Sequence, residues 1–134
     1  MKNIKNKYSE IFFKELTIED REEIYFNQYM WHAFSYQKIP CLEGLEAINE
    51  FKQKIKNNVY LFFQHNDTTL EMKNLTYEKL MDMINNEIID TDCYVVDKNF
   101  EWSFIYTHET ISDGTCDFIN PYYIGPFFIT TNNK

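Results

Sequence analysis

The sequence contains few residues that force a sharp turn, with three glycines and three prolines among 134 residues. This scarcity excludes a flexible Gly- or Pro-rich linker between domains, and no internal repeat or low-complexity segment occurs. A chain of this length typically forms one domain. We therefore expect a single globular domain over residues 1–134, with the polar segments 1–7 and 131–134 frayed at its ends.

Positive charge is also scarce. Thirteen Lys and Arg residues, among them the single Arg21, face twenty-one Asp and Glu residues, which gives a net charge of −8. Duplex nucleic acid and anionic membranes are bound mainly through Lys and Arg, so we expect neither as a partner. A basic protein partner is compatible with this charge, because opposite fields steer association. Alternatively, the acidic residues only keep the protein soluble.

Long apolar runs and regularly spaced cysteines are missing as well. No window approaches the roughly 20 apolar residues of a membrane span, and MKNIKNKYSE has no apolar run behind its lysines, as a signal peptide would require. Cys41, Cys93 and Cys116 are odd in number and widely spaced, which favours reduced thiols. We therefore expect a cytoplasmic protein. We also expect a monomer or homodimer, and no cofactor.

Apolar residues recur with helical spacing in three segments. The spacing predicts a long helix over residues 18–35, capped by Thr17, and a second helix over about 43–56. A third, short helix over about 77–86 follows Thr76, which can cap it.

Runs of aromatic and β-branched residues predict the strands. VYLFFQ (59–64) has no polar alternation, which indicates a strand covered on both faces. Residues 93–96 and 100–107 form a hairpin, and residues 126–130 offer a last strand; segments 8–16 and 70–75 stay undecided. The order predicts an α+β fold, with three helices packed on one face of a mainly antiparallel sheet of about four strands and a C-terminal β-hairpin.

Two histidines follow strands of this sheet. If the strand over 59–64 and the strand over 100–107 both run antiparallel to 93–96, His65 and His108 leave the sheet at one edge, close to Asp67 and Glu109. Imidazoles and carboxylates at one rim suit general acid–base work or a divalent metal. His65, His108 and Glu109 are the catalytic candidates, and His65, Asp67 and His108 are the weaker metal candidates. The sequence contains neither HExxH nor CxxC. The simpler alternative to a site is that His65 is a turn residue and that His108 and Glu109 are only the polar end of a core strand.

Enzyme motifs are otherwise absent, since the sequence has neither a Gly-rich phosphate loop nor a Gly-x-Ser-x-Gly elbow. Aromatic residues are abundant, at 18% of the chain, and they are enriched at protein interfaces. The candidates for a binding surface are Trp31, Phe34, Tyr36, Tyr122 and Tyr123. The alternative is that these aromatic side chains close one end of the core.

Four segments carry a resemblance. They are MWHAFSYQKIPCLEG (30–44), VYLFFQH (59–65), CYVVDKNFEWSFIYTHE (93–109) and IGPFF (124–128). Together they resemble a family of short, uncharacterised proteins from Gram-positive bacteria, classed only as a domain of unknown function. The resemblance covers about residues 17–128 and implies a bacterial cytoplasmic protein, without any activity, cofactor or catalytic residue. The pattern from Trp102 to Glu109 also resembles the strand endings of small bacterial immunity-type proteins.

Two hypotheses follow. The first is a non-enzymatic protein-binding module, of an immunity or inhibitor kind, whose acidic surface meets a basic partner. The second is a small metal-dependent or acid–base enzyme that uses the His/Glu rim at the sheet edge. The absence of enzyme motifs favours the first.

Overall fold

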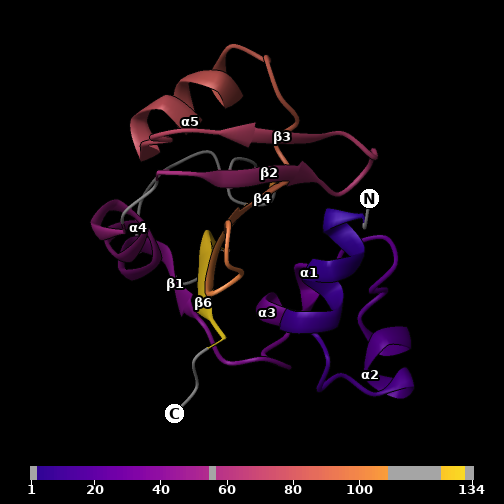
Figure 1. Ribbon diagram of the computed structural model, residues 1–134. Coiled ribbons are helices and arrows are strands. Elements are labelled where there is room, and N and C mark those ends of the chain that lie inside the picture. Colours follow the sequence, from indigo (N-terminus) through magenta and orange to yellow (C-terminus); the bar gives the residue numbers. More distant parts are fainter. Residues whose placement is uncertain (1–2, 55–56, 109–124, 132–134) are drawn as a thin grey trace.

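A computed structural model describes residues 3–54, 57–108 and 125–131. In this part of the chain, six strands form one antiparallel sheet in the order β1-β6-β5-β4-β2-β3 (Figure 1). The same residues also form five helices. The strands are β1 (Leu42–Glu43), β2 (Val59–Phe63), β3 (Thr69–Met72), β4 (Cys93–Asp97), β5 (Trp102–Tyr106) and β6 (Phe127–Thr130). The helices are α1 (Ile4–Phe12), α2 (Ile18–Glu23), α3 (His32–Ser35), α4 (Gly44–Gln53) and α5 (Tyr77–Asn85).

Helices cover both faces of the sheet. On one face Phe62 and Ile105 pack with the apolar side chains of residues 8–39, which include α1 and α3. On the other face Leu61 and Phe104 pack with α4 and α5. The predicted α+β class and the cover on both faces of residues 59–64 are therefore confirmed. The expectation of helices on a single face is wrong, because strands that read as continuous apolar runs need cover on both sides.

The predicted long helix over residues 18–35 is wrong, since it is broken into α2 and α3. The capping box of Thr17 and Asp20 starts α2 as expected. Tyr25, however, has a φ of 56°, which lies outside the right-handed helix. The apolar spacing continues past this break because the irregular segment still fills the core, where Phe26 and Met30 are buried.

The first helix lies in the polar N-terminal segment. Helix α1 begins at Ile4, inside the segment expected to be frayed, and the Asn3 side chain caps it by accepting a hydrogen bond from the backbone N–H of Asn6. Helix α1 also includes residues 8–12 of the undecided segment 8–16. The undecided segment 70–75 contributes the edge strand β3, and the two-residue strand β1 had no signal in the sequence.

Candidate functional site

Two histidines meet at one edge of the sheet. Strands β2 and β5 both run antiparallel to β4, so their C-terminal ends lie at the same edge as the start of β4. His65 comes two residues after β2, and His108 comes two residues after β5. Asp92 comes directly before β4 and lies between them. The structure therefore brings His65 and His108 together, through an aspartate that the sequence analysis missed.

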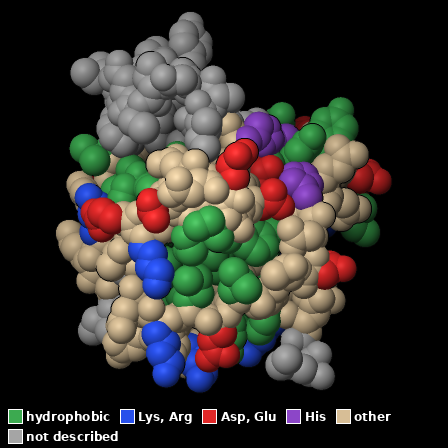
Figure 2. All heavy atoms as spheres, turned by 90° about the horizontal axis from the view of Figure 1, so that it is seen from above, with side chains coloured by type: hydrophobic (Ala, Val, Ile, Leu, Met, Phe, Trp, Pro, Cys, Tyr) green, Lys and Arg blue, Asp and Glu red, His purple; other side chains and the backbone are tan. Residues whose placement is uncertain are grey.

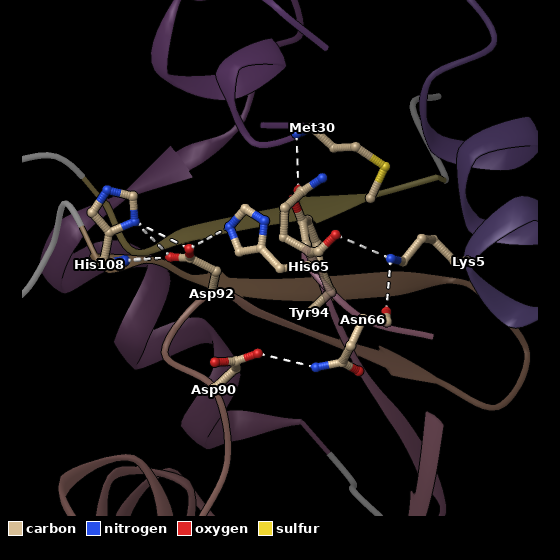
Figure 3. Close-up of polar contacts among 9 residues, drawn as sticks. Lys5, Met30, His65, Asn66, Asp90, Asp92, Tyr94 and His108 are labelled. Carbon is tan, nitrogen blue, oxygen red and sulfur yellow. Dashed lines mark hydrogen bonds and ion pairs between the residues drawn. The ribbon is translucent and has the colours of Figure 1, made fainter. Parts of the chain in front are cut away.

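Asp92 is bonded to both imidazoles (Figure 3). Its Oδ2 lies 3.0 Å from Nε2 of His65, and its Oδ1 lies 2.9 Å from Nδ1 of His108. The backbone N–H of His108 also donates to Oδ1 at 2.6 Å. The Asp92 side chain is 9% exposed, whereas the imidazoles of His65 and His108 are 49% and 53% exposed. A nearly buried carboxylate therefore obtains the donors that it needs from two half-exposed histidines.

The outer nitrogen of each imidazole remains available. Among the described residues, Nδ1 of His65 and Nε2 of His108 have no hydrogen-bond partner. When a neutral imidazole donates one N–H to a carboxylate, its other nitrogen presents a lone pair. Each histidine can then act as a base, or as a single ligand.

Aromatic rings of residues 29–36 form a wall beside this rim. The Trp31 ring meets the His108 ring edge-on at 5.5 Å between centroids, and the Tyr29 ring meets the His65 ring at 6.2 Å. The third histidine, His32, is buried behind them, where its Nδ1 lies 2.6 Å from the Ile24 carbonyl oxygen. The wall packs one side of each rim histidine.

A second polar network holds the end of β2 that carries His65. The buried Gln64 side chain accepts hydrogen bonds from the Met30 backbone N–H, at 2.9 Å, and from the Tyr94 hydroxyl. Lys5 Nζ donates to the carbonyl oxygens of Gln64 and Asn66, at 3.2 and 3.0 Å. Burial lowers the pKa of Lys5, against the opposing effect of a nearby acidic side chain. Helix α1 and the aromatic wall are thereby tied to the rim.

The remaining predicted site residues do not join the rim. Asp67 contacts neither imidazole within the described chain, and Glu109 lies outside the described residues. No group of three or more His, Cys, Asp or Glu side chains among the described residues is arranged to hold a metal ion. The carboxylate of Asp92 lies where an ion shared by His65 and His108 would lie (Figure 3). The described geometry thus does not assemble His65, Asp67 and His108 as metal ligands.

The five residues predicted for a binding surface do not share one environment. Trp31 and Phe34 are completely buried, so the expectation that they form a contact surface is corrected, because both fill the core beneath α3. Tyr36 is 51% exposed and stacks on the His32 ring at 4.8 Å. Tyr122 and Tyr123 lie outside the described residues.

An exposed apolar surface lies instead at and after α2. Ile18 and Tyr25 are 74% and 63% exposed, and both line a hollow of about 480 Å³ together with Arg21 and Phe26. The guanidinium of Arg21 lies 4.5 Å from the centre of the Phe26 ring, and Arg21 also donates to the Phe13 carbonyl oxygen at 3.0 Å. We call Ile18, Tyr25 and the exposed Glu19, Glu22 and Glu23 the α2 surface. The sequence gives no sign of this surface, because the apolar spacing predicts a continuous helix over residues 18–35 and not a break at Tyr25.

These features define an α+β protein with an antiparallel sheet and helices on both of its faces. The family model described as "Domain of unknown function (DUF4275)" matches residues 2–123, so the chain belongs to this family. That description states no activity, organism or partner. No curated protein and no solved structure matches the chain. Over the described residues, no helix has the length and apolar character needed to cross a membrane.

Proposed function

We propose that this protein is a non-enzymatic binding module for a basic protein, of an immunity or inhibitor kind, and that the partner docks on the α2 surface. The observation that carries the proposal is the placement of Tyr25. Its backbone is left-handed, at a φ of 56°, and its side chain is 63% exposed. A left-handed conformation costs a non-glycine residue about 1–2 kcal/mol. Burial of the tyrosine would offset that cost, but this ring remains largely in solvent.

Two other residues of this chain have left-handed backbone just past a helix, and they show which side chains are usual at that position. Gln37 follows α3 with a φ of 60°, and Glu87 follows α5 with a φ of 57°. Both are polar and exposed, as expected at the left-handed position just past a helix. Tyr25 occupies the corresponding position after α2, with an aromatic side chain. Strained backbone that presents an exposed side chain is concentrated at functional sites.

The acidic charge of α2 favours a basic partner. The sequence IEDREE of α2 carries four acidic residues and one arginine, and that arginine is engaged by Phe13 and Phe26. Lys38 Nζ lies 2.5 Å from Glu23 and 3.5 Å from Asp20, whereas no ion pair in the described chain engages Glu19 or Glu22. A tyrosine anchor within a negative rim suits a basic protein, because tyrosines dominate binding hot spots and opposite charges steer association.

The test compares two substitutions that relieve the same kind of backbone conformation, only one of which alters the α2 surface. Tyr25→Gly removes the aromatic anchor and relieves the backbone, so it should raise the free energy of unfolding by about 1 kcal/mol while it weakens partner binding at least tenfold. Gln37→Gly is the matched control, since it relieves the same kind of backbone and leaves the α2 surface intact. Affinity purification from the cells of origin, with retained proteins identified by mass spectrometry, gives the readout.

A basic protein retained by the wild type and by Gln37→Gly, and lost with Tyr25→Gly and with Glu22→Lys, is the expected result. Equal retention by all variants, or no basic protein bound to the wild type, overturns the proposal. Urea unfolding of each variant shows that lost binding does not reflect lost folding.

A second function is favoured by the rim. The outer nitrogens of His65 and His108 are without partners in the described chain, and Asp92 orients both rings. This arrangement suits general acid–base chemistry, with one imidazole accepting a proton and the other donating one. A panel of chromogenic esters and phosphodiesters tests it. Turnover that disappears in both His65→Gln and His108→Gln supports this function, and turnover that survives either change, or none in the wild type, contradicts it.

A further inference from the structure

Strand β3 lies at the edge of the sheet, and no described residue pairs with its outer side. The opposite edge is formed by β1, which has only two residues. Strand β3 has four residues, in which half-buried Leu70 and Met72 alternate with exposed Thr69 and Glu71. An unpaired edge of this kind is a template for pairing with another strand.

The face that carries β3 and α5 is apolar at its centre. Figure 2 shows hydrophobic side chains gathered there, with Lys, Asp and Glu side chains around them. Partly buried hydrophobic residues at β3 and α5 pack against the core that α4 and α5 form with the sheet, among them Leu70, Met72, Tyr77, Met81 and Met83. Methionine side chains are flexible and adapt to a partner surface, so the edge of β3 adjoins a surface fit for contact.

We propose that β3 pairs antiparallel with β3 of a second copy of this chain, with Met72 opposite Met72. Residues directly opposite each other in a sheet share a face. A two-fold pairing that keeps the apolar faces of both copies aligned is therefore centred on a residue of β3. This restriction leaves few registers to compare.

The charges of β3 and the residue after it select among these registers. Centring on Glu71 places two carboxylates opposite each other, which is unfavourable. Centring on Leu70 pairs the exposed Glu71 with the uncharged Thr69. The opposite charges that this register would align, Lys73 and Asp67, both lie outside β3. Centring on Met72 places Glu71 of each copy opposite Lys73 of the other, which forms two complementary cross-strand pairs. Of these registers, all of which keep the apolar faces aligned, only the last gives Glu71 of β3 a partner of opposite charge.

Within one copy, Glu71 has a weak competitor for this pairing. Lys98 Nζ lies 4.0 Å from the Glu71 carboxylate, and both side chains are 56% exposed. An exposed ion pair at this distance contributes little and leaves Glu71 available. A strand of four residues makes a small interface, so the dimer is concentration-dependent and weaker than an obligate one.

A charge exchange tests the register. Glu71→Lys and Lys73→Glu each replace two attractive pairs with two repulsive ones, so each is expected to weaken self-association about tenfold or more, as measured by sedimentation velocity. An equimolar mixture of the two variants restores association, because one chain then carries lysine at both positions and faces a chain that carries glutamate at both. Glu15→Lys makes the same charge change at an exposed position away from β3 and leaves association unchanged.

A wild type that stays monomeric at every concentration overturns the proposal, and so does a mixture of the two variants that associates no better than either alone. The outcome is independent of the proposed partner at the α2 surface. Tyr25→Gly leaves self-association unchanged, and the charge exchange leaves the retention of a basic protein unchanged.

Discussion

Asp92 accepts two hydrogen bonds from His108, one from the backbone N–H at 2.6 Å and one from Nδ1 at 2.9 Å. The backbone bond fixes where the chain leaves β5, and the side-chain bond fixes the orientation of the ring. Asp92 also accepts from His65, and its backbone carbonyl accepts from the backbone N–H of Gln64 at 3.1 Å. One buried carboxylate therefore joins the ends of β2 and β5 and the start of β4.

Replacing Asp92 with Asn should lower the free energy of unfolding by about 2 kcal/mol, because a hydrogen bond to a charged group contributes about 1.5–3 kcal/mol. The amide of Asn also turns a donor toward one of the imidazoles. Urea unfolding at neutral pH measures the loss. Asp90→Asn is the matched control, since exposed Asp90 bonds only to Asn66 in the described chain and should change stability by less than about 0.5 kcal/mol. Equal losses in the two variants would show that Asp92 does not hold the rim.

Tyr8 joins the first helix to the sheet through a buried hydroxyl pair. Its hydroxyl donates to Ser103 Oγ at 2.7 Å, and Ser103 Oγ donates to the Val95 carbonyl oxygen at 2.7 Å. We expect Tyr8→Phe to cost about 1 kcal/mol, and Ser103→Ala to cost more, because it leaves the buried Tyr8 hydroxyl without its acceptor. The double variant should cost less than the sum of the two single losses. Additive losses in urea unfolding would show that the two hydroxyls are not coupled.

Stability should fall at alkaline pH. Burial raises the pKa of Tyr8 and of Tyr94 well above the ordinary value of a tyrosine. Below a pH of about 10, the folded and the unfolded chain both keep these phenolic protons, so the stabilisation is fully present. Above this pH the unfolded chain releases them first. The stabilisation is therefore lost as the pH rises toward the higher pKa of the folded state. Between pH 9 and 11 each buried tyrosine should account for about 1 kcal/mol of the fall. Urea unfolding at both pH values measures it, and Tyr8→Phe, with one buried phenol fewer, should show a smaller fall.

Most regular elements could be read from local patterns, because each has a signal in its own residues. The apolar run at Val59 predicted β2, and the spacing of Leu80 and Ile84 predicted α5. The break at Tyr25 could not be read, since the buried residues on either side of it keep a helical spacing while the chain turns. Helix α1 was missed because only Tyr8 and Phe12 of its nine residues are buried.

The candidate site was predictable only in outline. Strand ends predicted that His65 and His108 would share an edge, given one assumption about strand pairing, and β4 does pair with both neighbours as assumed. Asp92 lies in a short polar segment before an apolar run, and no feature of the local sequence distinguishes it from Asp90. Its role depends on three chain segments meeting at one point, which is a property of the fold.

Cys41 should react slowly with alkylating reagents. Burial, and to a lesser extent the charge of Glu43, raises its pKa to about 12. Only the thiolate reacts, so at pH 8 the folded chain should be alkylated by iodoacetamide more than tenfold more slowly at Cys41 than the chain unfolded in urea. Peptide mass spectrometry follows the labelling site by site. Glu43→Gln removes the smaller of the two causes and should raise the rate only modestly. If Cys41 is labelled as fast in the folded chain as in the unfolded chain, its thiol is not buried as the structure describes.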